Sequence, residues 1–197
     1  MNIAFFDFDG TITKRDSFLD FIISSAGLTR FLCGMFLLLP TLIRYMLKLS
    51  SNQEAKQKVI QYFFQGMPYK DFCTIAFKYS TEKIPRIVRK IAMMKIADHK
   101  KNGDIIVVVS ASPEEWLRPW CNRNSVELIG TRLEVINDQI TGKIMGMNCH
   151  GEEKVQRIHQ NYKLDQYERI YSYGNSSGDR DLLDIADVKY YKWRLFS

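Results

Sequence analysis

The chain has few cysteines, and they are too far apart for the sites that cysteine usually builds. None belongs to a Cys-x-x-Cys pair or has a closely spaced histidine partner, since the four stand at Cys33, Cys73, Cys121 and Cys149. This spacing argues against both a zinc site and a disulfide framework. We therefore expect reduced thiols in a cytosolic compartment. The histidines also lack helical metal-binding spacing, and we expect no essential role for His99, His150 or His159.

Long apolar runs are scarce too, and the chain has no internal repeat or low-complexity segment. Residues 31–49, which begin with Phe31 and end with Leu49, form the one long apolar stretch after the N-terminus. Their uncharged part ends at Ile43 and is shorter than the about 20 residues that a membrane span needs. Two interpretations stay open. The segment is either a pair of helices buried in an α-helical insertion, or an apolar surface resting on a membrane, flanked by Arg30, Arg44 and Lys48.

The composition is that of a folded protein with a substantial core. The 197 residues allow one domain of ordinary size or a core with a modest insertion, and 46% of them are hydrophobic. Disorder is therefore not expected. The net charge of +6 suits an anionic ligand or an acidic membrane face, but its spread along the chain does not indicate nucleic acid. No signal peptide is expected, because a strand with two aspartates begins at the N-terminus.

The order of expected elements predicts an α/β fold with a helical insertion. Residues 14–90 show helical periodicity and no strand pattern, with helices expected over 52–65 and 69–80. After residue 91 helices and strands alternate, which is typical of a parallel sheet with helices on both faces. We expect strands at residues 2–6, 105–109, 128–129, 170–173 and 188–191, the last at an edge, and a hairpin from 132–135 and 140–145.

Two aspartates follow the first expected strand directly. Asp7 and Asp9 alternate at its end, and Gly10 and Thr11 then break the strand and free backbone N–H groups. Open α/β sheets bind ligands at the carboxyl ends of their strands. An acidic pair in that place suits a hard cation such as Mg²⁺, which prefers oxygen ligands.

The second expected strand also ends in polar residues. Ser112 and Glu115 fit a capping box, with Pro113 at the first helical position, so we expect a helix to begin here. The free N–H groups of that helix and the Ser110 hydroxyl, next to Ala111, would form a cradle for an anion. Capping alone explains Ser112 but not Ser110.

Two later features have both an ordinary and a functional interpretation. Lys154 begins an amphipathic helix, where a lysine is usually a solvated surface charge. A Gly-rich loop runs from Gly174 through Asn175 to Asp179 after the strand at 170–173. It is either a normal turn with acids at a helix N-terminus or a further set of oxygen ligands for a metal.

These motifs together resemble one family. Asp7-Phe-Asp9-Gly-Thr11, Ser110, Lys154 and Gly174-Asn-x-x-x-Asp179 occur in the order found in the haloacid dehalogenase-like phosphohydrolases. The insertion after the first motif is similar to the helical cap of the phosphoserine phosphatase-like branch. The resemblance implies a Rossmann-like core of residues 1–13 and 91–197 and an all-α cap of residues 14–90.

The resemblance also implies a role for each motif. Asp7 would be the nucleophile that forms an aspartyl-phosphate, and Asp9 the general acid and then the general base. Mg²⁺ would be held by Asp7, the Asp9 carbonyl and the loop residues Asn175 and Asp179. The phosphoryl oxygens would be bound by Thr11, Ser110, Ala111 and Lys154.

The sequence departs from the family pattern at one metal ligand. The fourth motif commonly has an acid where this chain has Asn175. An amide oxygen can still bind Mg²⁺, but it adds no charge, so we expect weaker metal affinity.

The substrate is less well defined. Asp16 stands where phosphoserine phosphatases have a glutamate for the substrate ammonium, but residues 54–65 contain no arginine for the carboxylate, only Lys56 and Lys58. A small phosphorylated metabolite is the first expectation. Residues 31–49, 149–154 and 191–194 are also similar to bacterial phosphatidylglycerophosphate phosphatases, so a lipid phosphate is the alternative. A non-catalytic phosphate-binding module is a remote third.

Overall fold

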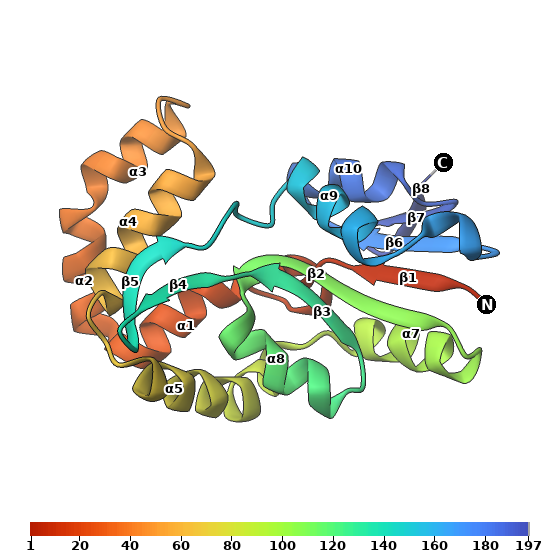
Figure 1. The fold of residues 1–197 in the computed structure, drawn as a ribbon, viewed down its shortest axis with the longest axis horizontal. Helices are drawn as coiled ribbons and strands as arrows, with labels where there is room; N and C mark the ends of the chain where they lie inside the picture. The colour runs from red at the N-terminus through yellow and green to blue at the C-terminus, as the bar shows by residue number, and fades with distance from the viewer. Residues whose placement is uncertain (197) are drawn as a thin grey trace.

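The computed structural model describes residues 1–196 and has a mostly parallel six-stranded sheet at its centre. The strand order is β3-β2-β1-β6-β7-β8, so β1 (Ile3–Phe6) lies between β2 (Ile105–Pro113) and β6 (Ile170–Gly174). All pairs are parallel except β7–β8. Figure 1 shows α9 and α10 over one face of the sheet and α7 and α8 over the other. The predicted α/β class with helices on both faces is confirmed.

The alternation of side chains along β1 explains why both faces are covered. Ile3 and Phe5 belong to the apolar cluster that includes Ile158 of α9 and Leu182 of α10. Ala4 and Phe6 belong to the cluster on the opposite face, which includes side chains of α7 and α8. Because successive side chains of a strand point to opposite faces, a strand of four apolar residues needs a partner layer on each side.

The remaining strands follow the predicted ones closely. β3 spans Glu127–Thr131 and β7 spans Val188–Tyr191. The prediction that β7 forms the edge is wrong, because β8 (Arg194–Phe196) pairs with it in antiparallel orientation. The hairpin consists of β4 (Leu133–Ile136) and β5 (Gln139–Ile144). It lies against the helical insertion, where the Ile144 N–H donates to the Gln57 side chain over 2.9 Å.

The helices of the core are α7 (Lys90–Lys101), α8 (Glu114–Arg123), α9 (Glu152–Asn161) and α10 (Arg180–Asp184). The predicted capping box at the start of α8 is wrong. β2 continues to Pro113, which is the N-cap residue of α8 and makes no side-chain cap bond. The Ser112 hydroxyl instead donates to Asp9 over 2.7 Å, so an acceptor in the site replaces the helix terminus as its partner.

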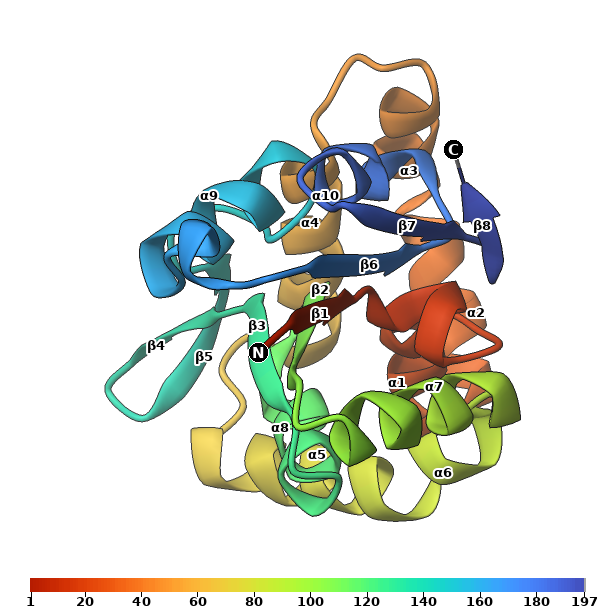
Figure 2. The ribbon, with the colours of Figure 1, turned by 90° about the vertical axis from the view of Figure 1, so that its right-hand side faces the viewer.

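The insertion contains α1 (Ser17–Ala26), α2 (Leu28–Leu37), α3 (Leu39–Met46), α4 (Asn52–Phe64), α5 (Tyr69–Glu82) and α6 (Ile84–Ile87). A bridge between Thr13 and Val88 brings its two ends together. Figures 1 and 2 place α2, α3 and α4 at one end of the molecule, away from the N-terminus. The division into a cap of residues 14–90 and a core stays a prediction.

The interpretation of residues 31–49 as buried helices is wrong. α3 buries no residue, and in α2 only Gly34 is buried. Gly34 packs so closely on α4 that an added Cβ would lie 2.5 Å from the Phe63 ring. Within residues 1–196 no single helix is long and apolar enough to cross a membrane. α1 and α2 pass that test together by length and composition, with a 118° bend between them.

Phe21 ties the insertion to the core, and its removal should destabilise the protein. Its fully buried ring stacks on Trp116 of α8, with ring centroids 4.3 Å apart. We expect Phe21→Ala to lower the free energy of unfolding by about 3 to 5 kcal/mol, because a large cavity forms in the core. Phe36→Ala on α2 should change it by less than about 0.5 kcal/mol, since that side chain is 75% exposed. Urea unfolding measures both, and equal losses would contradict the burial described above.

Candidate active site

Four separate motifs meet at the carboxyl edge of the central strands. β1, β2 and β6 are neighbours in parallel register, so the residues that follow them lie side by side. Asp7, Asp9 and Lys154 line one cleft of about 390 Å³, together with Asp16, Ala111, Ser112 and Asp179. Thr11 and Ser110 are buried beside it. The structure therefore brings together the residues that the sequence analysis selected.

A buried lysine joins two carboxylates at the centre of the cleft. Lys154 Nζ donates to Asp7 Oδ1 and to Asp179 Oδ1, each over 2.7 Å. The Lys154 side chain is only 2% exposed, so it is not the surface charge that its position in α9 would suggest. Burial alone would lower the pKa of Lys154, but the two carboxylates raise it. The lysine is therefore a permanent cation between Asp7 and Asp179.

The two carboxylates respond differently to the same lysine. Burial raises the pKa of Asp7 to about 7, helped by the nearby carboxylates of Asp179 and Asp9 and opposed by Lys154. Burial acts in the same direction on Asp179, yet Lys154 and the N–H groups of the loop leave its pKa below the usual value. Asp179 Oδ2 accepts hydrogen bonds from the backbone N–H groups of Asn175 and Ser176 and from the Ser176 hydroxyl. Both oxygens of Asp179 are thus engaged.

Asp9 is held by three groups from two elements. Its Oδ1 accepts from the Ser17 N–H at the start of α1 over 2.6 Å. Its Oδ2 accepts from the hydroxyls of Ser112 over 2.7 Å and Ser110 over 3.4 Å, both from β2. The sequence analysis missed this role of Ser112. The alternation of Ser110 and Ser112 on a strand could have indicated it, because residues two apart share a face.

Asn175 faces three oxygens of the first motif. In the orientation that pairs its amide with these acceptors, the nitrogen lies 3.1 Å from Thr11 Oγ1, 3.2 Å from the Asp9 carbonyl and 3.3 Å from Asp7 Oδ2. The approach requires Gly10, which has φ +83° and whose Cβ, if present, would lie 2.2 Å from the amide.

The oxygen atoms around Asn175 are suitable ligands for a hard cation. Asp7 Oδ2, the Asp9 carbonyl and, after rotation of the amide, the Asn175 oxygen are the oxygen ligands that Mg²⁺ prefers, with waters completing the shell. Among residues 1–196 no group of three or more His, Cys, Asp or Glu side chains stands ready to hold a metal. That result is compatible with this set, since one of its donors is a carbonyl and another an amide.

Asp16, Lys56 and His150 also line the cleft. Asp16 is the N-cap of α1, and its Oδ1 accepts from the N–H groups of Phe18 and Leu19. Burial and then the Asp9 charge raise its pKa. Lys56 and His150 line the cleft and were not selected from the sequence as site residues. Lys56 Nζ donates to the Ala111 carbonyl over 2.9 Å, and burial lowers its pKa to about 8.

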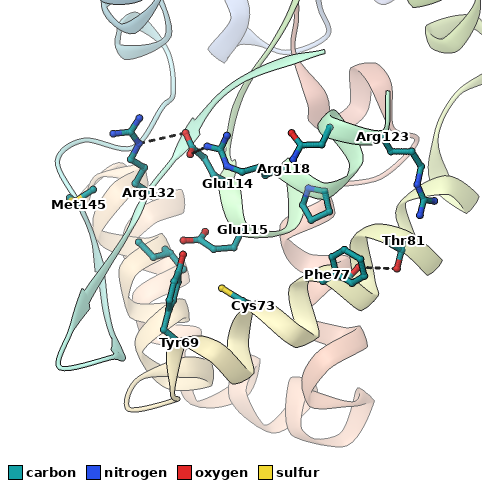
Figure 3. A pocket seen from close by; sticks show the side chains of 13 residues that line it. Tyr69, Cys73, Phe77, Thr81, Glu114, Glu115, Arg118, Arg123, Arg132 and Met145 are labelled. Carbon is teal, nitrogen blue, oxygen red and sulfur yellow. Dashed lines mark hydrogen bonds and ion pairs between the residues drawn. The ribbon is translucent and has the colours of Figure 1, made fainter. Parts of the chain in front are cut away.

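A separate cavity of about 620 Å³ contains none of the motif residues (Figure 3). It is lined by α5, α8 and the β4–β5 hairpin, including Tyr69, Cys73, Glu115 and Arg118. Burial raises the pKa of Glu115 there to about 7. Burial also raises the pKa of the Cys73 thiol, which makes it a poor nucleophile. The candidate chemistry therefore lies in the smaller cleft, where the motif residues meet.

A mostly parallel sheet with a carboxylate–lysine cluster at its carboxyl edge is the arrangement of an α/β enzyme. The family model for haloacid dehalogenase-like hydrolases matches residues 4–184. The chain is 33% identical to the protein CicA of Caulobacter vibrioides over 189 residues, which cover 95% of this chain and 84% of that protein. The chain therefore belongs to the haloacid dehalogenase-like hydrolases.

Two further similarities concern phosphatases. A histidinol-phosphatase of Neisseria meningitidis serogroup C is 28% identical over 116 residues, which cover 55% of this chain and 52% of that protein. A structure described as a phospho-aspartyl intermediate analogue of phosphoserine phosphatase shares the fold with a TM-score of 0.68. It is 16% identical, and the alignment covers 96% of this chain and 85% of that one. This chain therefore has the fold of that phosphatase, as the resemblance to the phosphoserine phosphatase-like branch implied.

Lys154 should stabilise the folded protein as well as position Asp7 and Asp179. We expect Lys154→Met to lower the free energy of unfolding by about 3 to 5 kcal/mol at neutral pH, because two buried carboxylates lose their counter-charge. The loss should shrink at mildly acidic pH, because without the lysine the pKa values of both buried carboxylates rise and the variant takes up protons there. Lys189→Met removes an exposed pair with Asp184 and should cost less than about 1 kcal/mol. Denaturant unfolding of both variants at two pH values tests this, and a pH-independent loss would refute it.

Proposed function

We propose that the protein is a Mg²⁺-dependent phosphomonoester hydrolase that works through an aspartyl-phosphate on Asp7. The observation that carries the proposal is the placement of Asp7 and Asp9 in one cleft with a buried lysine between Asp7 and Asp179. This set contains a nucleophile, a proton donor and a fixed cation for the phosphate. Those are the parts that phosphoryl transfer through a covalent intermediate requires.

In the first step the Asp7 carboxylate attacks phosphorus and the bond to the leaving oxygen breaks. Asp9, in its protonated form, gives its proton to that oxygen and becomes a carboxylate. Its hydrogen bonds from the Ser17 N–H and the Ser112 hydroxyl keep the side chain directed into the cleft. These bonds also stabilise the carboxylate that remains after the proton has left.

In the second step water attacks the phosphorus of the aspartyl-phosphate. Asp9 accepts the proton of that water, and the Asp7 carboxylate leaves, which restores both groups. Lys154, Thr11 and Ser110 hold phosphoryl oxygens, and the backbone around Ala111 contributes its N–H group. Fixed donors of this kind stabilise the charge of the transition state without having to reorganise.

The metal belongs to the same proposal. Asp7, the Asp9 carbonyl and Asn175 would hold Mg²⁺, and Asp179 would support the site through Lys154 and the loop. Bound there, Mg²⁺ would offset the repulsion between the carboxylate and the phosphate. Because both oxygens of Asp179 are engaged, this indirect role replaces, in the proposal, the direct ligation that the resemblance implied.

The lining of the cleft bears on the choice of substrate. Among the residues that line it none is an arginine, and Asp16 uses one of its oxygens to cap α1. Both features are unfavourable for an amino-acid substrate such as phosphoserine. Apolar side chains of α2 and α3, from Met35, Leu42 and Tyr45, line the cleft instead. They favour the alternative, an ester with an apolar part.

The third alternative, a non-catalytic phosphate-binding module, would show no turnover of an aryl phosphate with Mg²⁺.

Asp7→Asn should abolish turnover while the fold survives. An amide is too weak a nucleophile to replace the carboxylate, so we expect a loss of roughly 10⁴-fold or more with an aryl phosphate and Mg²⁺. Fluoroberyllate, which mimics a phosphoryl group on aspartate, should bind the wild type and not the variant. Asp165→Asn, an exposed change outside the cleft, is the matched control and should be fully active. Substantial hydrolysis by Asp7→Asn would exclude the covalent mechanism.

The Mg²⁺ requirement should follow the charge around Asn175. We expect Asn175→Asp to lower the Mg²⁺ concentration for half-maximal activity, because it replaces a neutral ligand by a charged one. Asp179→Ala should raise that concentration, since Lys154 would then face the metal site with one carboxylate fewer. Each shift should be roughly tenfold or more. Activity titrated against Mg²⁺ measures both, and overlapping curves for Asp179→Ala and the wild type would remove Asp179 from the metal site.

A further inference from the structure

The helices α2 and α3 expose an unusual amount of apolar surface. Leu28, Leu32 and Phe36 recur every four residues along α2, and all three are exposed, Phe36 by 75%. Residues at this spacing share one face of a helix. The row continues through α3 and the turn after it, with exposed side chains at Leu39, Ile43, Met46, Leu47 and Leu49. We call these eight residues the apolar face. Clustered exposure of this kind marks a surface that binds something.

Helix α2 is attached to the protein by the side opposite the apolar face. Phe31 stacks near Phe63 of α4, and Gly34 allows α2 to approach α4 closely. The preceding helix α1 is fixed in the core by Phe21 and Ile22, both fully buried. The apolar face is therefore not needed to fold the insertion, and it can be covered by an external partner without rearrangement.

The charges around the apolar face favour an anionic lipid surface. Between Asp20 and Glu54 the sequence has no acidic residue. Of its three cations, Arg30 donates to the Phe63 carbonyl of α4, while Arg44 and Lys48 are exposed on α3 and the turn after it. Apolar helices flanked by cations lie at the boundary between lipid headgroups and acyl chains. A symmetric contact with a second copy would bring the same patch, with Arg44 and Lys48, against itself. The lipid surface complements this charge and the second copy does not.

The apolar face and the active-site cleft share the same two helices. Met35 of α2 and Leu42 and Tyr45 of α3 line the cleft, while the apolar face points outward. The same cleft contains Asp7 and Lys154. An ester with its phosphate at Asp7 would therefore extend its organic part along the wall that α2 and α3 form.

We propose that α2 and α3 dock on an anionic lipid surface through the apolar face, and that the phosphomonoester taken by the cleft carries an acyl chain. This substrate class rests on the hydrolase function proposed above, whereas the docking does not. Docking places α2 and α3 at the boundary between lipid headgroups and acyl chains, where such an ester is found. The acyl part would enter beside Met35 and Leu42, and the phosphate would reach Lys154.

Flotation with vesicles tests the docking. The wild type should float with vesicles of phosphatidylglycerol and phosphatidylcholine. Phe36→Ser/Ile43→Ser should lose at least about tenfold in affinity, since one fully buried large apolar side chain alone corresponds to about that factor. The matched control is Phe77→Ser/Met94→Ser, two exposed residues of α5 and α7, which should float like the wild type. Unchanged melting temperatures for both double variants show that folding is not the cause of any loss.

Charge variants test the choice of lipid. Arg44→Gln/Lys48→Gln should weaken binding to the anionic vesicles by roughly fivefold for each cation removed. It should leave the weaker binding to pure phosphatidylcholine unchanged. A wild type that does not float, or a Phe36→Ser/Ile43→Ser variant that floats normally, overturns the docking. So does a wild-type dimer that the same variant converts to a monomer, because the apolar face would then be an interface between two copies.

Two substrates separate this proposal from the hydrolase function. Phe36→Ser/Ile43→Ser should hydrolyse a water-soluble aryl phosphate like the wild type, but should lose about tenfold or more on a long-chain lysophosphatidate carried in vesicles. A wild type active on the aryl phosphate and inactive on the vesicle substrate refutes the acyl-chain substrate and leaves the hydrolase function. A wild type that floats but hydrolyses neither substrate refutes the hydrolase function and leaves the docking.

Discussion

The contact between Lys154 and the carboxylates of Asp7 and Asp179 is the constraint on which the rest of the structure depends. Three charged groups leave water at this point, and each costs several kcal/mol unless its partners are at hydrogen-bonding distance. Asp7 follows β1, Asp179 follows β6 and Lys154 lies on α9. The order of the central strands and the placement of α9 on one face of the sheet are therefore fixed together. The same contact leaves the cluster with a net negative charge, which suits a site that must also accept a divalent cation.

The sequence predicts the core well because the core follows local patterns. A four-residue apolar strand that ends in carboxylates, and a continuous apolar strand at β2, can only be central strands of a parallel sheet. Because these strands are parallel, the polar residues at their carboxyl ends lie at one edge of the sheet. Asp7, Ser110 and Asn175 could be grouped for this reason. The edge position assigned to β7 was wrong because the three residues of β8 are too few to show a strand pattern.

The errors elsewhere concern partners that sequence patterns do not contain. Hydrophobicity gives the helical periodicity of α2 and α3 but not which face is covered. The covering helix α4 meets α2 at Phe31 and at a small residue, Gly34, which no hydrophobic pattern marks. Ser112 fits a capping box by spacing, yet its hydroxyl finds a stronger acceptor in Asp9, more than one hundred residues away in sequence. Lys56 was considered only as a cation near a substrate carboxylate. Its position was set by the Ala111 carbonyl, a contact between two distant segments.

The two serines of β2 make the site depend on strand register as well as on residue identity. Ser110 and Ser112 both reach Asp9 because they are two residues apart on one strand. A slip of β2 by one residue would exchange every side chain between the two faces. Ala111 would then stand where a hydroxyl is required, although the apolar residues of β2 would remain buried between two helical layers. Such a slipped state would be folded but inactive. The position of Asp9 is therefore more sensitive to the register of β2 than the stability of the protein is.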